Sequence, residues 1–234
     1  MSVLAVIPAR GGSRGLPRKN VQIVAGRPLI AWTVDAAREA RNVGRVIVST
    51  DDAEIAEVAR SCGAEVPLLR PAELARDDTP GVEPALHIVE WLAANEKFHA
   101  GKVILLQPTS PLRTADDIDE AIGLMDARGA SAVVGVTPVT SHPAWMKQIA
   151  SDGTLIDAPG LSDAETLRQQ LPPLYVVNGA IYLVARDVLL ARRSFYAERT
   201  LAYVMPADRS LDIDSSWDLR VADLALAARQ RERV

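Results

Sequence analysis

Residues 4–20 read LAVIPARGGSRGLPRKN, so a short apolar run passes directly into a glycine-rich, basic turn. An apolar run of this length followed by glycine indicates a buried strand that ends in a tight turn. Similar runs recur along the chain with amphipathic stretches between them, which is typical of β-α-β units around a parallel sheet. The sequence therefore predicts an α/β fold with an open, mostly parallel, Rossmann-like sheet.

The expected elements follow from the two hydrophobic periods. The predicted strands are residues 4–7, 46–48, 66–69, 103–106, 132–136, 176–184 and 201–204. Helices are predicted from Pro28 toward Arg41, around 55–62 and 118–125, and from about Ser215 onward. The last helix presents an apolar face made of Trp217, Val221, Leu224, Ala225 and Ala228.

Residues 138–175 interrupt this rhythm. The stretch is rich in proline and has no clean helical period. It is also longer than an ordinary connection, since loops beyond about 12–15 residues are uncommon in compact domains and are usually functional. It contains apolar residues that the main sheet has no evident way to bury: Trp145, Met146, Ile149, Leu155 and Ile156. We predict a main α/β domain of residues 1–137 and 176–234, with an inserted arm of residues 138–175 that includes a hairpin.

Composition restricts the classes of partner. The chain has 26 basic and 30 acidic residues, mixed along its length, so no nucleic-acid surface is expected. Its apolar runs are strand-sized, far below the roughly 20 residues that cross a bilayer, so no membrane partner is expected either. The single cysteine, Cys62, cannot form an internal disulfide, and the first strand leaves no room for a signal peptide. These features predict a cytoplasmic location.

The basic loop, residues 9–20, has the composition of a phosphate site. Three glycines, Gly11, Gly12 and Gly15, permit close approach of the backbone, and their amides with that of Ser13 can cradle phosphate oxygens. Four cations supply positive charge: Arg10, Arg14, Arg18 and Lys19. The spacing matches neither the dinucleotide fingerprint G-x-G-x-x-G nor the ATPase motif G-x-x-x-x-G-K-[ST].

The basic loop resembles the signature of CMP-acylneuraminate (sialic acid) synthetases and of their bacterial relatives that activate legionaminic and pseudaminic acids. Further segments follow in that family's order: STD at 49–51, LRPAEL at 69–74, LLQPTSPLR at 105–113, RQQLP at 168–172, NGAIY at 178–182 and DID at 212–214. The resemblance implies the nucleotide-diphospho-sugar transferase fold. It also implies transfer of CMP from CTP to the anomeric hydroxyl of a nine-carbon 2-keto acid sugar, with release of pyrophosphate.

The resemblance also implies roles for individual residues. Those expected to bind the nucleotide are Ala9, Arg10, Gly11, Gly12, Ser13, Arg14, Lys19, Asn20 and Arg70. Those expected to bind the sugar are Gln107, Lys147, Arg168, Asn178 and Tyr182. Those expected to act in catalysis are Arg10, Lys19, Asp212 and Asp214. In the family the region of the arm crosses to a second subunit, so a homodimer is expected, with Arg168 and Lys147 completing the partner's sugar site.

Asp212 and Asp214, the acidic pair, are two apart in an extended segment, so both carboxylates project from one side. Hard oxygen ligands with open positions suit Mg²⁺, the cofactor that we expect here. Capping of the last helix is the alternative, because Ser215 and Asp218 have the spacing of a capping box.

Two other functions remain as alternatives. One is a cytidylyltransferase for the eight-carbon acid Kdo, but that relative has a carboxylate after the fourth strand, where this chain has Gln107. The other is a catalytically silent protein that binds a nucleotide or a sugar. The presence of Lys19 together with the acidic pair argues against a silent protein.

Overall fold

The computed structural model describes residues 2–12, 15–158 and 167–232. Its centre is a six-stranded sheet in the order β10-β6-β9-β5-β1-β4. The mutually parallel strands are β1 (Val3–Pro8), β4 (Val43–Ser49), β5 (Lys102–Leu105), β6 (Ala132–Pro138) and β10 (Thr200–Val204). Strand β9 (Tyr175–Ala185) runs antiparallel between β5 and β6. The prediction of an open, mostly parallel α/β sheet is therefore confirmed.

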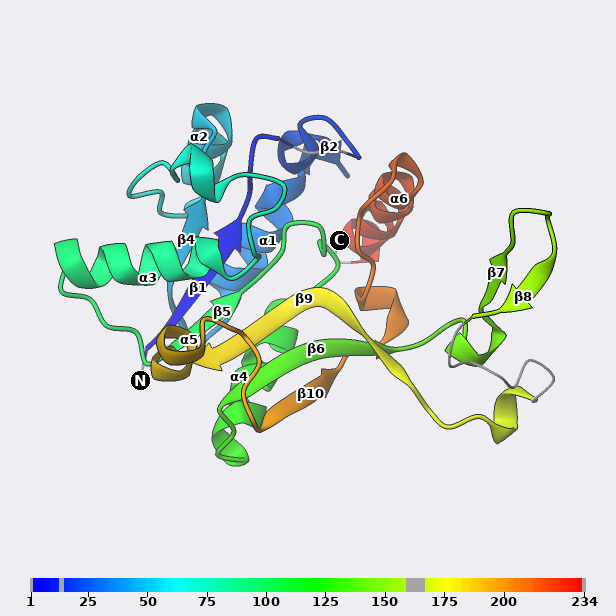
Figure 1. Cartoon of the computed structure of the whole chain (residues 1–234). Helices are drawn as coiled ribbons and strands as arrows, with labels where there is room; N and C mark the ends of the chain where they lie inside the picture. Colours follow the sequence, from blue (N-terminus) through cyan, green and yellow to red (C-terminus); the bar gives the residue numbers. More distant parts are fainter. Residues whose placement is uncertain (1, 13–14, 159–166, 233–234) are drawn as a thin grey trace.

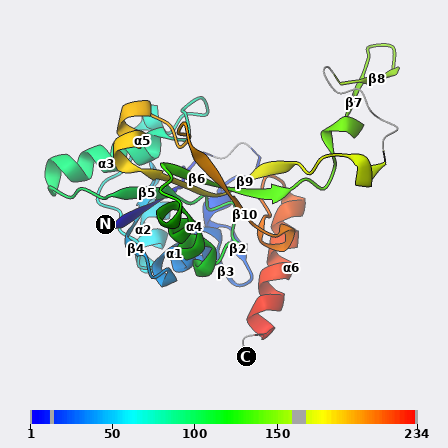
Figure 2. The same ribbon diagram turned by 90° about the horizontal axis from the view of Figure 1, so that it is seen from below.

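Helices cover both faces of the sheet (Figure 1, Figure 2). Helices α1 (Leu29–Glu39), α2 (Ala53–Ser61) and α4 (Ala115–Ala127) pack on one face, and α3 (Glu83–Asn95) and α5 (Arg186–Arg192) pack on the other. Alternate residues of β1 divide between the two hydrophobic clusters: Val3, Ala5 and Ile7 join the first, Leu4 and Val6 the second. Because both faces are covered, β1 is apolar throughout, which is why its sequence shows no alternation.

The last helix, α6 (Ser216–Glu232), packs outside these layers, against the short hairpin of β2 (Ile23–Val24) and β3 (Arg27–Pro28). Its buried residues are Ala222 and Leu226. The predicted apolar face was wrong in its centre, because Trp217 and Leu224 are 68% and 69% exposed. The helix instead buries Ala222 and Leu226, while Arg229 and Gln230 donate to backbone carbonyls of the loops beneath it.

Three other elements differ from the predictions. Residues 66–69 are not a strand, because the only bridge near them, between Ile47 and Glu65, is made by the residue before this segment. Helices α3 and α5 were not predicted. Helix α3 is apolar around much of its circumference, with Trp91 and Val82 packed beside its fully buried residues, so the amphipathic period is weak there.

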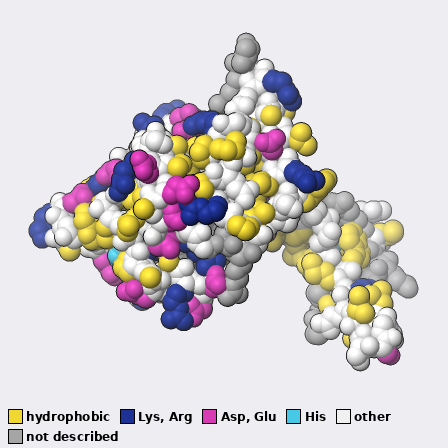
Figure 3. Space-filling view, turned by 90° about the horizontal axis from the view of Figure 1, so that it is seen from above, with side chains coloured by type: hydrophobic (Ala, Val, Ile, Leu, Met, Phe, Trp, Pro, Cys, Tyr) yellow, Lys and Arg dark blue, Asp and Glu magenta, His cyan; other side chains and the backbone are white. Residues whose placement is uncertain are grey.

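The arm extends away from the sheet (Figure 1, Figure 2). It contains the predicted hairpin, formed by β7 (Lys147–Ile149) and β8 (Leu155–Asp157), and the short 3₁₀ turns Pro143–Trp145 and Arg168–Gln170. Apolar side chains are prominent on its surface (Figure 3): Ile149 is 76% exposed and Leu155 is 64% exposed. Elsewhere, no helix in the described part of the chain has the length and apolar character needed to cross a bilayer.

Candidate active site

The basic loop leaves the sheet at the carboxyl end of β1. Three hydrogen bonds hold the backbone at its start, and two of them are made to residues outside the loop. The amide of Ala9 donates to the carbonyl of Ser49 at 3.0 Å, and the buried Asn20 side chain donates to the carbonyl of Arg10 at 3.0 Å. The amide of Gly11 donates to Asp51 Oδ1 at 3.0 Å. Ala9 is 1% exposed, its methyl group belongs to the core and its amide is bonded to Ser49.

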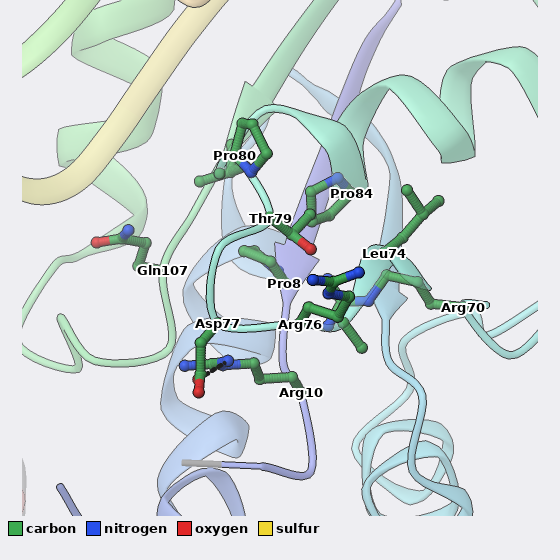
Figure 4. A pocket seen from close by; sticks show the side chains of 13 residues that line it. Pro8, Arg10, Arg70, Leu74, Arg76, Asp77, Thr79, Pro80, Pro84 and Gln107 are labelled. Carbon is green, nitrogen blue, oxygen red and sulfur yellow. Dashed lines mark hydrogen bonds and ion pairs between the residues drawn. The ribbon is translucent and has the colours of Figure 1, made fainter. Parts of the chain in front are cut away.

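Each of three cations of the basic loop contacts a different acidic group. Arg10 Nη1 donates to Asp77 Oδ1 at 2.5 Å, from the segment before α3 (Figure 4). Arg18 donates to Asp52 Oδ2 at 2.6 Å. The Asp52 carboxylate also caps α2 by accepting from the amide of Ile55. The Arg18 guanidinium first, and then this amide, lower the pKa of Asp52. The loop is therefore held in shape by charges from two neighbouring segments. Ser13 and Arg14 lie outside the described residues.

The third cation, Lys19, joins the basic loop to the acidic pair. Lys19 Nζ donates to the carbonyl of Ile213 at 2.6 Å and lies 3.5 Å from Asp214 Oδ1. The backbone at Gly15 also lies close to this segment. A Cβ added at Gly15 would lie only 2.8 Å from the carbonyl oxygen of Asp214. The backbone approach therefore requires glycine at position 15. The structure thus brings together two segments that are almost 200 residues apart in the sequence.

The acidic pair lies in an extended segment between β10 and α6. The amide of Ile213 donates to the carbonyl of Thr109 at 2.9 Å, and its side chain is fully buried. The helix-capping role is filled by Asp218, whose Oδ2 accepts from the amide of Ser215 at 2.8 Å and from that of Asp214 at 3.2 Å. The Asp214 carboxylate is consequently not used as a cap, and its side chain is 82% exposed. The carboxylate therefore contacts Lys19 and is otherwise open to solvent.

The electrostatics of the acidic pair fit a divalent cation. Partial desolvation, and then the charge of Asp214, raise the pKa of Asp212, whereas Thr109 and Lys19 lower it. Two like charges that destabilise each other are the arrangement that a bound dication relieves. Within the described residues, no cluster of three or more His, Cys, Asp or Glu could hold a metal. The pair would supply two oxygens and leave other positions to water and phosphate, as Mg²⁺ accepts.

A first cavity, of about 230 Å³, opens beside the basic loop (Figure 4). Its polar lining includes Arg10, Arg70, Asp77 and Gln107, and prolines line much of the remainder. Arg70 is 5% exposed, and its Nε has no hydrogen-bond partner among the described residues. Burial lowers the pKa of Arg70, and Asp51, 3.9 Å away, partly offsets this. The cavity therefore offers a buried, incompletely satisfied arginine to a polar ligand.

A second cavity, of about 310 Å³, adjoins the first and shares Leu105 and Gln107 with it. Its other walls include Tyr182, Phe195 and Tyr196. The ring centroids of Tyr182 and Phe195 are 5.8 Å apart. Burial, and then the neighbouring Tyr196 and Asp212, raise the pKa of Tyr182, so its hydroxyl stays protonated at neutral pH. Arg193 also lines this second cavity, and Gln107 lies on the boundary between the two.

Asn178 does not face the second cavity as a sugar ligand would. Its side chain is 4% exposed, and its Nδ2 donates to Ser210 Oγ at 3.0 Å and to Met205 Sδ at 3.2 Å. Its Oδ1 accepts from the amide of Ala180 at 3.1 Å. Direct sugar contact by this side chain does not fit its burial. The next residue, Gly179, has φ 73° and lies against Gln107 Oε1, which a Cβ would approach to 2.4 Å.

The two arm residues predicted to bind sugar belong to different elements of the arm. Lys147 is on β7 and pairs with Asp157 of β8, within the hairpin. Arg168 begins the 3₁₀ turn Arg168–Gln170. Lys147 is not among the described residues that line either cavity. Among the described residues, the site therefore gathers Arg10, Lys19, Arg70, Gln107, Tyr182 and the acidic pair.

The comparisons with known proteins now identify the family. The sequence profile of the cytidylyltransferase family matches residues 4–200. The chain belongs to that family. CMP-N,N'-diacetyllegionaminic acid synthase of Legionella pneumophila is 36% identical over 235 residues, covering all of both chains. N-acylneuraminate cytidylyltransferase of Streptococcus agalactiae serotype V is 35% identical over 93% of this chain but only 52% of the relative, so this chain spans about half of that relative's length.

Solved structures show the same fold for this cytidylyltransferase. The structure of CMP:2-keto-3-deoxy-manno-octonic acid synthetase complexed with CTP has a TM-score of 0.72, covers 98% of this chain and 100% of that one, and is 19% identical. The 4-diphosphocytidyl-2C-methyl-D-erythritol synthase from Anaerococcus prevotii has a TM-score of 0.65 and is 14% identical, with 96% of each chain covered. At these identities the likeness shows the architecture.

Sequence reasoning missed two acidic residues of the cytidylyltransferase site. Asp51 binds the amide of Gly11 and faces Arg70, so it orients both the basic loop and the first cavity. Its place directly after a strand at the same sheet edge was the available signal. Asp77 contacts Arg10 from a segment without any recognisable motif, so no signal in the sequence pointed to it.

Proposed function

We propose that this protein transfers CMP from CTP to the anomeric hydroxyl of a nine-carbon 2-keto acid sugar, an N-acylneuraminate, legionaminate or related nonulosonate. The observation that carries the proposal is the pair of adjoining cavities that meet at Gln107, one lined by Arg10 and Arg70 and the other by aromatic side chains and Arg193. The relatives that match over most of this chain are named for CMP-legionaminate and N-acylneuraminate chemistry, which supports this class of acceptor.

The first cavity would hold the nucleotide. Arg70 would donate to the carbonyl and ring nitrogen acceptors of cytosine, for which its unsatisfied Nε and buried position suit it. Arg10 would leave Asp77 and bind the triphosphate instead. Gly11 and Gly12 follow Arg10 directly, so their backbone would lie beside the phosphates. Lys19 is fixed beside the acidic pair, where its charge would stabilise the phosphates as pyrophosphate departs.

The reaction is an in-line displacement at the α-phosphorus. The anomeric oxygen forms a bond to that phosphorus, the bond to the bridging oxygen of pyrophosphate breaks, and the hydroxyl proton passes to a base. Mg²⁺ held by Asp212 and Asp214 would supply neutralisation of the phosphate charges when bound. The protein's own part is placement: Lys19 and Gly15 hold the acidic pair against the basic loop, and Gln107 separates the two substrates.

The arm supports a homodimer. Its apolar side chains stand away from the main sheet, and Ile149, Leu155 and Met146 are 76%, 64% and 49% exposed. Covering them with a second copy would remove this apolar area from water. We propose that residues 138–175 act as a dimerisation arm on the nucleotidyltransferase domain of residues 1–137 and 176–234, and that Arg168 and Lys147 complete the partner's sugar site. A guanidinium at position 168 suits a sugar carboxylate because it can bind both oxygens. A cytoplasmic location, where CTP is available, fits this activity.

The test is pyrophosphate release with Mg²⁺ and CTP, using N-acetylneuraminate, N,N'-diacetyllegionaminate and Kdo as acceptors. We expect turnover with a nine-carbon acid, a product of the mass of a CMP-sugar, and no turnover with ATP. Asp212→Asn is the inactive control. Preference for Kdo would overturn the proposed acceptor. CTP binding without turnover on any nine-carbon acid would overturn the assignment as an enzyme for this class of sugar.

A further inference from the structure

We infer that Arg209 and Asp117 are positioning residues that hold the acidic pair in place for its metal ion, an inference that rests on the proposed function. Arg209 ends the 3₁₀ turn Ala207–Arg209, three residues before Asp212. Its Nη2 donates to Asp117 Oδ1 at 2.9 Å, and its Nε donates to Asp117 Oδ2 at 3.0 Å. One edge of the guanidinium therefore donates to both carboxylate oxygens, which fixes direction as well as distance.

Asp117 is a rigid anchor for this contact. It is the third residue of α4, and its Oδ2 also accepts from the amide of Thr114 at 2.9 Å and from Thr114 Oγ1 at 2.8 Å. Its side chain is fully buried. Burial raises the pKa of Asp117, but the bonds from Arg209 and Thr114 outweigh it and leave the pKa below its ordinary value. The carboxylate is therefore charged and held in place, and Arg209 is the cation that bonds to it directly.

The same segment has further attachments on either side of Arg209. Tyr203 of β10 places its hydroxyl 3.0 Å from Asp117 Oδ1. Arg229 of α6 donates to the carbonyl of Asp208 at 3.0 Å. Asn178 donates to Ser210 Oγ, which gives its buried amide a role in holding this segment. Downstream, Ile213 is fixed by Thr109 and Lys19. Arg209–Asp117 is the only ion pair with a fully buried carboxylate among the described contacts of this segment, so it is the attachment whose loss should shift the acidic pair most.

Helix α4 provides a matched control two residues away. Asp119 is also buried, and its carboxylate accepts from the amide and Nε of Arg41 at 3.0 and 3.1 Å and from the amide of Asn42 at 2.9 Å. As with Asp117, hydrogen bonds outweigh burial and lower its pKa. Asp119 anchors the end of α1 instead of the acidic segment. Asp119→Asn therefore removes an equivalent charge from the same helix without touching the segment of the acidic pair.

The experiment titrates Mn²⁺ into protein saturated with CTP, without sugar, and follows the bound ion by relaxation enhancement of water protons. The variants are Asp117→Asn, Arg209→Lys, Asp119→Asn and Asp212→Asn, each with its thermal midpoint recorded. We expect Asp117→Asn and Arg209→Lys to raise the Mn²⁺ midpoint by about 10-fold or more, as loss of an outer partner of a metal ligand commonly does. Asp119→Asn should stay within about twofold of wild type by the same reasoning.

The outcomes separate this inference from the proposed function. If wild type binds Mn²⁺ and Asp212→Asn does not, but Asp117→Asn and Arg209→Lys behave like Asp119→Asn, the positioning role is wrong and the proposed function stands. If wild type turns over CTP yet binds no Mn²⁺ at the acidic pair, both the metal assignment and the positioning role fall. Recovery of wild-type kcat at high Mg²⁺ by Arg209→Lys would support positioning, because a lysine retains the charge but cannot make the bidentate contact.

Discussion

The basic loop and the arm both extend from the same sheet, yet their side chains are satisfied in opposite ways. In the basic loop, Arg10, Arg18 and Lys19 each contact a group from elsewhere in the same chain. In the arm, large apolar side chains such as Ile149 and Leu155 are mostly exposed. The described part of the loop is held by contacts within the chain, whereas the arm leaves apolar side chains uncovered. This difference is the basis for proposing a phosphate site in the loop and a second molecule on the arm.

The largest effect is expected in the basic loop. Lys19→Ala should lower kcat by about 10²–10³-fold, because it removes a fixed charge from the departing phosphates. The fold should persist, since Ile213 remains held by Thr109. Steady-state pyrophosphate release and circular dichroism check both statements. Turnover within twofold of wild type would show that the contact to the Ile213 carbonyl has no catalytic consequence.

The proposed dimer interface of the arm is tested by introducing a charge on its apolar surface. Ile149→Asp should shift the protein from dimer to monomer in light scattering, because it places a charge in the proposed interface. It should raise the sugar KM by about 10-fold or more while leaving the CTP KM within about twofold, since only the sugar site would be shared. Ile23→Asp is the matched control, because Ile23 is 63% exposed on β2, outside the arm. A wild-type protein that is monomeric and fully active would contradict the shared site.

Arg168→Ala sharpens the same contrast within the arm. We expect the sugar KM to rise several-fold more than the CTP KM, because a bidentate carboxylate contact is lost on one substrate only. Lys147→Ala should have a smaller effect, since Lys147 pairs with Asp157 inside the hairpin. Steady-state kinetics with each substrate varied in turn provide the measurement. Equal changes in both KM values would point to a general disturbance of the arm.

A pH dependence is expected in the basic loop. The pKa of Asp52 is lowered, first by Arg18, so the folded state holds this proton less tightly than the unfolded state. The stability from this pair is therefore present above the unfolded pKa and is lost as pH falls through the lowered folded pKa. Asp52→Asn keeps the helix cap and should cost about 1 kcal/mol at pH 7. Urea unfolding at pH 7 and pH 3 should show that difference shrinking at the acidic pH.

The smallest effect is expected at Asp77. Asp77→Asn should lower the KM for CTP by up to about fivefold, because an exposed ion pair with Arg10 is worth at most about 1 kcal/mol and competes with the triphosphate. The sugar KM should not change. A raised KM for CTP would instead show that Asp77 orients Arg10 for the nucleotide. Isothermal titration with CTP distinguishes the two.

Local sequence signals predicted the parts of the site that depend on backbone chemistry. The glycines and cations of the basic loop and the spacing of the acidic pair are read directly from the chain, and the structure brings these two segments into contact through Lys19 and Gly15. Contacts that depend on distant packing could not be read from the sequence. The sequence around Asn178 would be the same whether its side chain faced a sugar or Ser210. Only the structure shows that the side chain is buried and bonded to Ser210. Asp77 reaches Arg10 across 67 positions, a contact that no local period encodes.

The position of β9 has a consequence for how the chain folds. Strand β9 separates β5 from β6, so residues 102–105 and 132–138 are synthesised before the strand that lies between them. Leu105 pairs with Tyr182, and Pro138 pairs with Tyr175 across the whole arm. The sheet therefore cannot close until about residue 185 has left the ribosome, and its central pairings are non-local, which slows folding. Until then two apolar strand edges and the exposed arm coexist, so this nascent chain should depend on chaperones more than a helical protein of equal length.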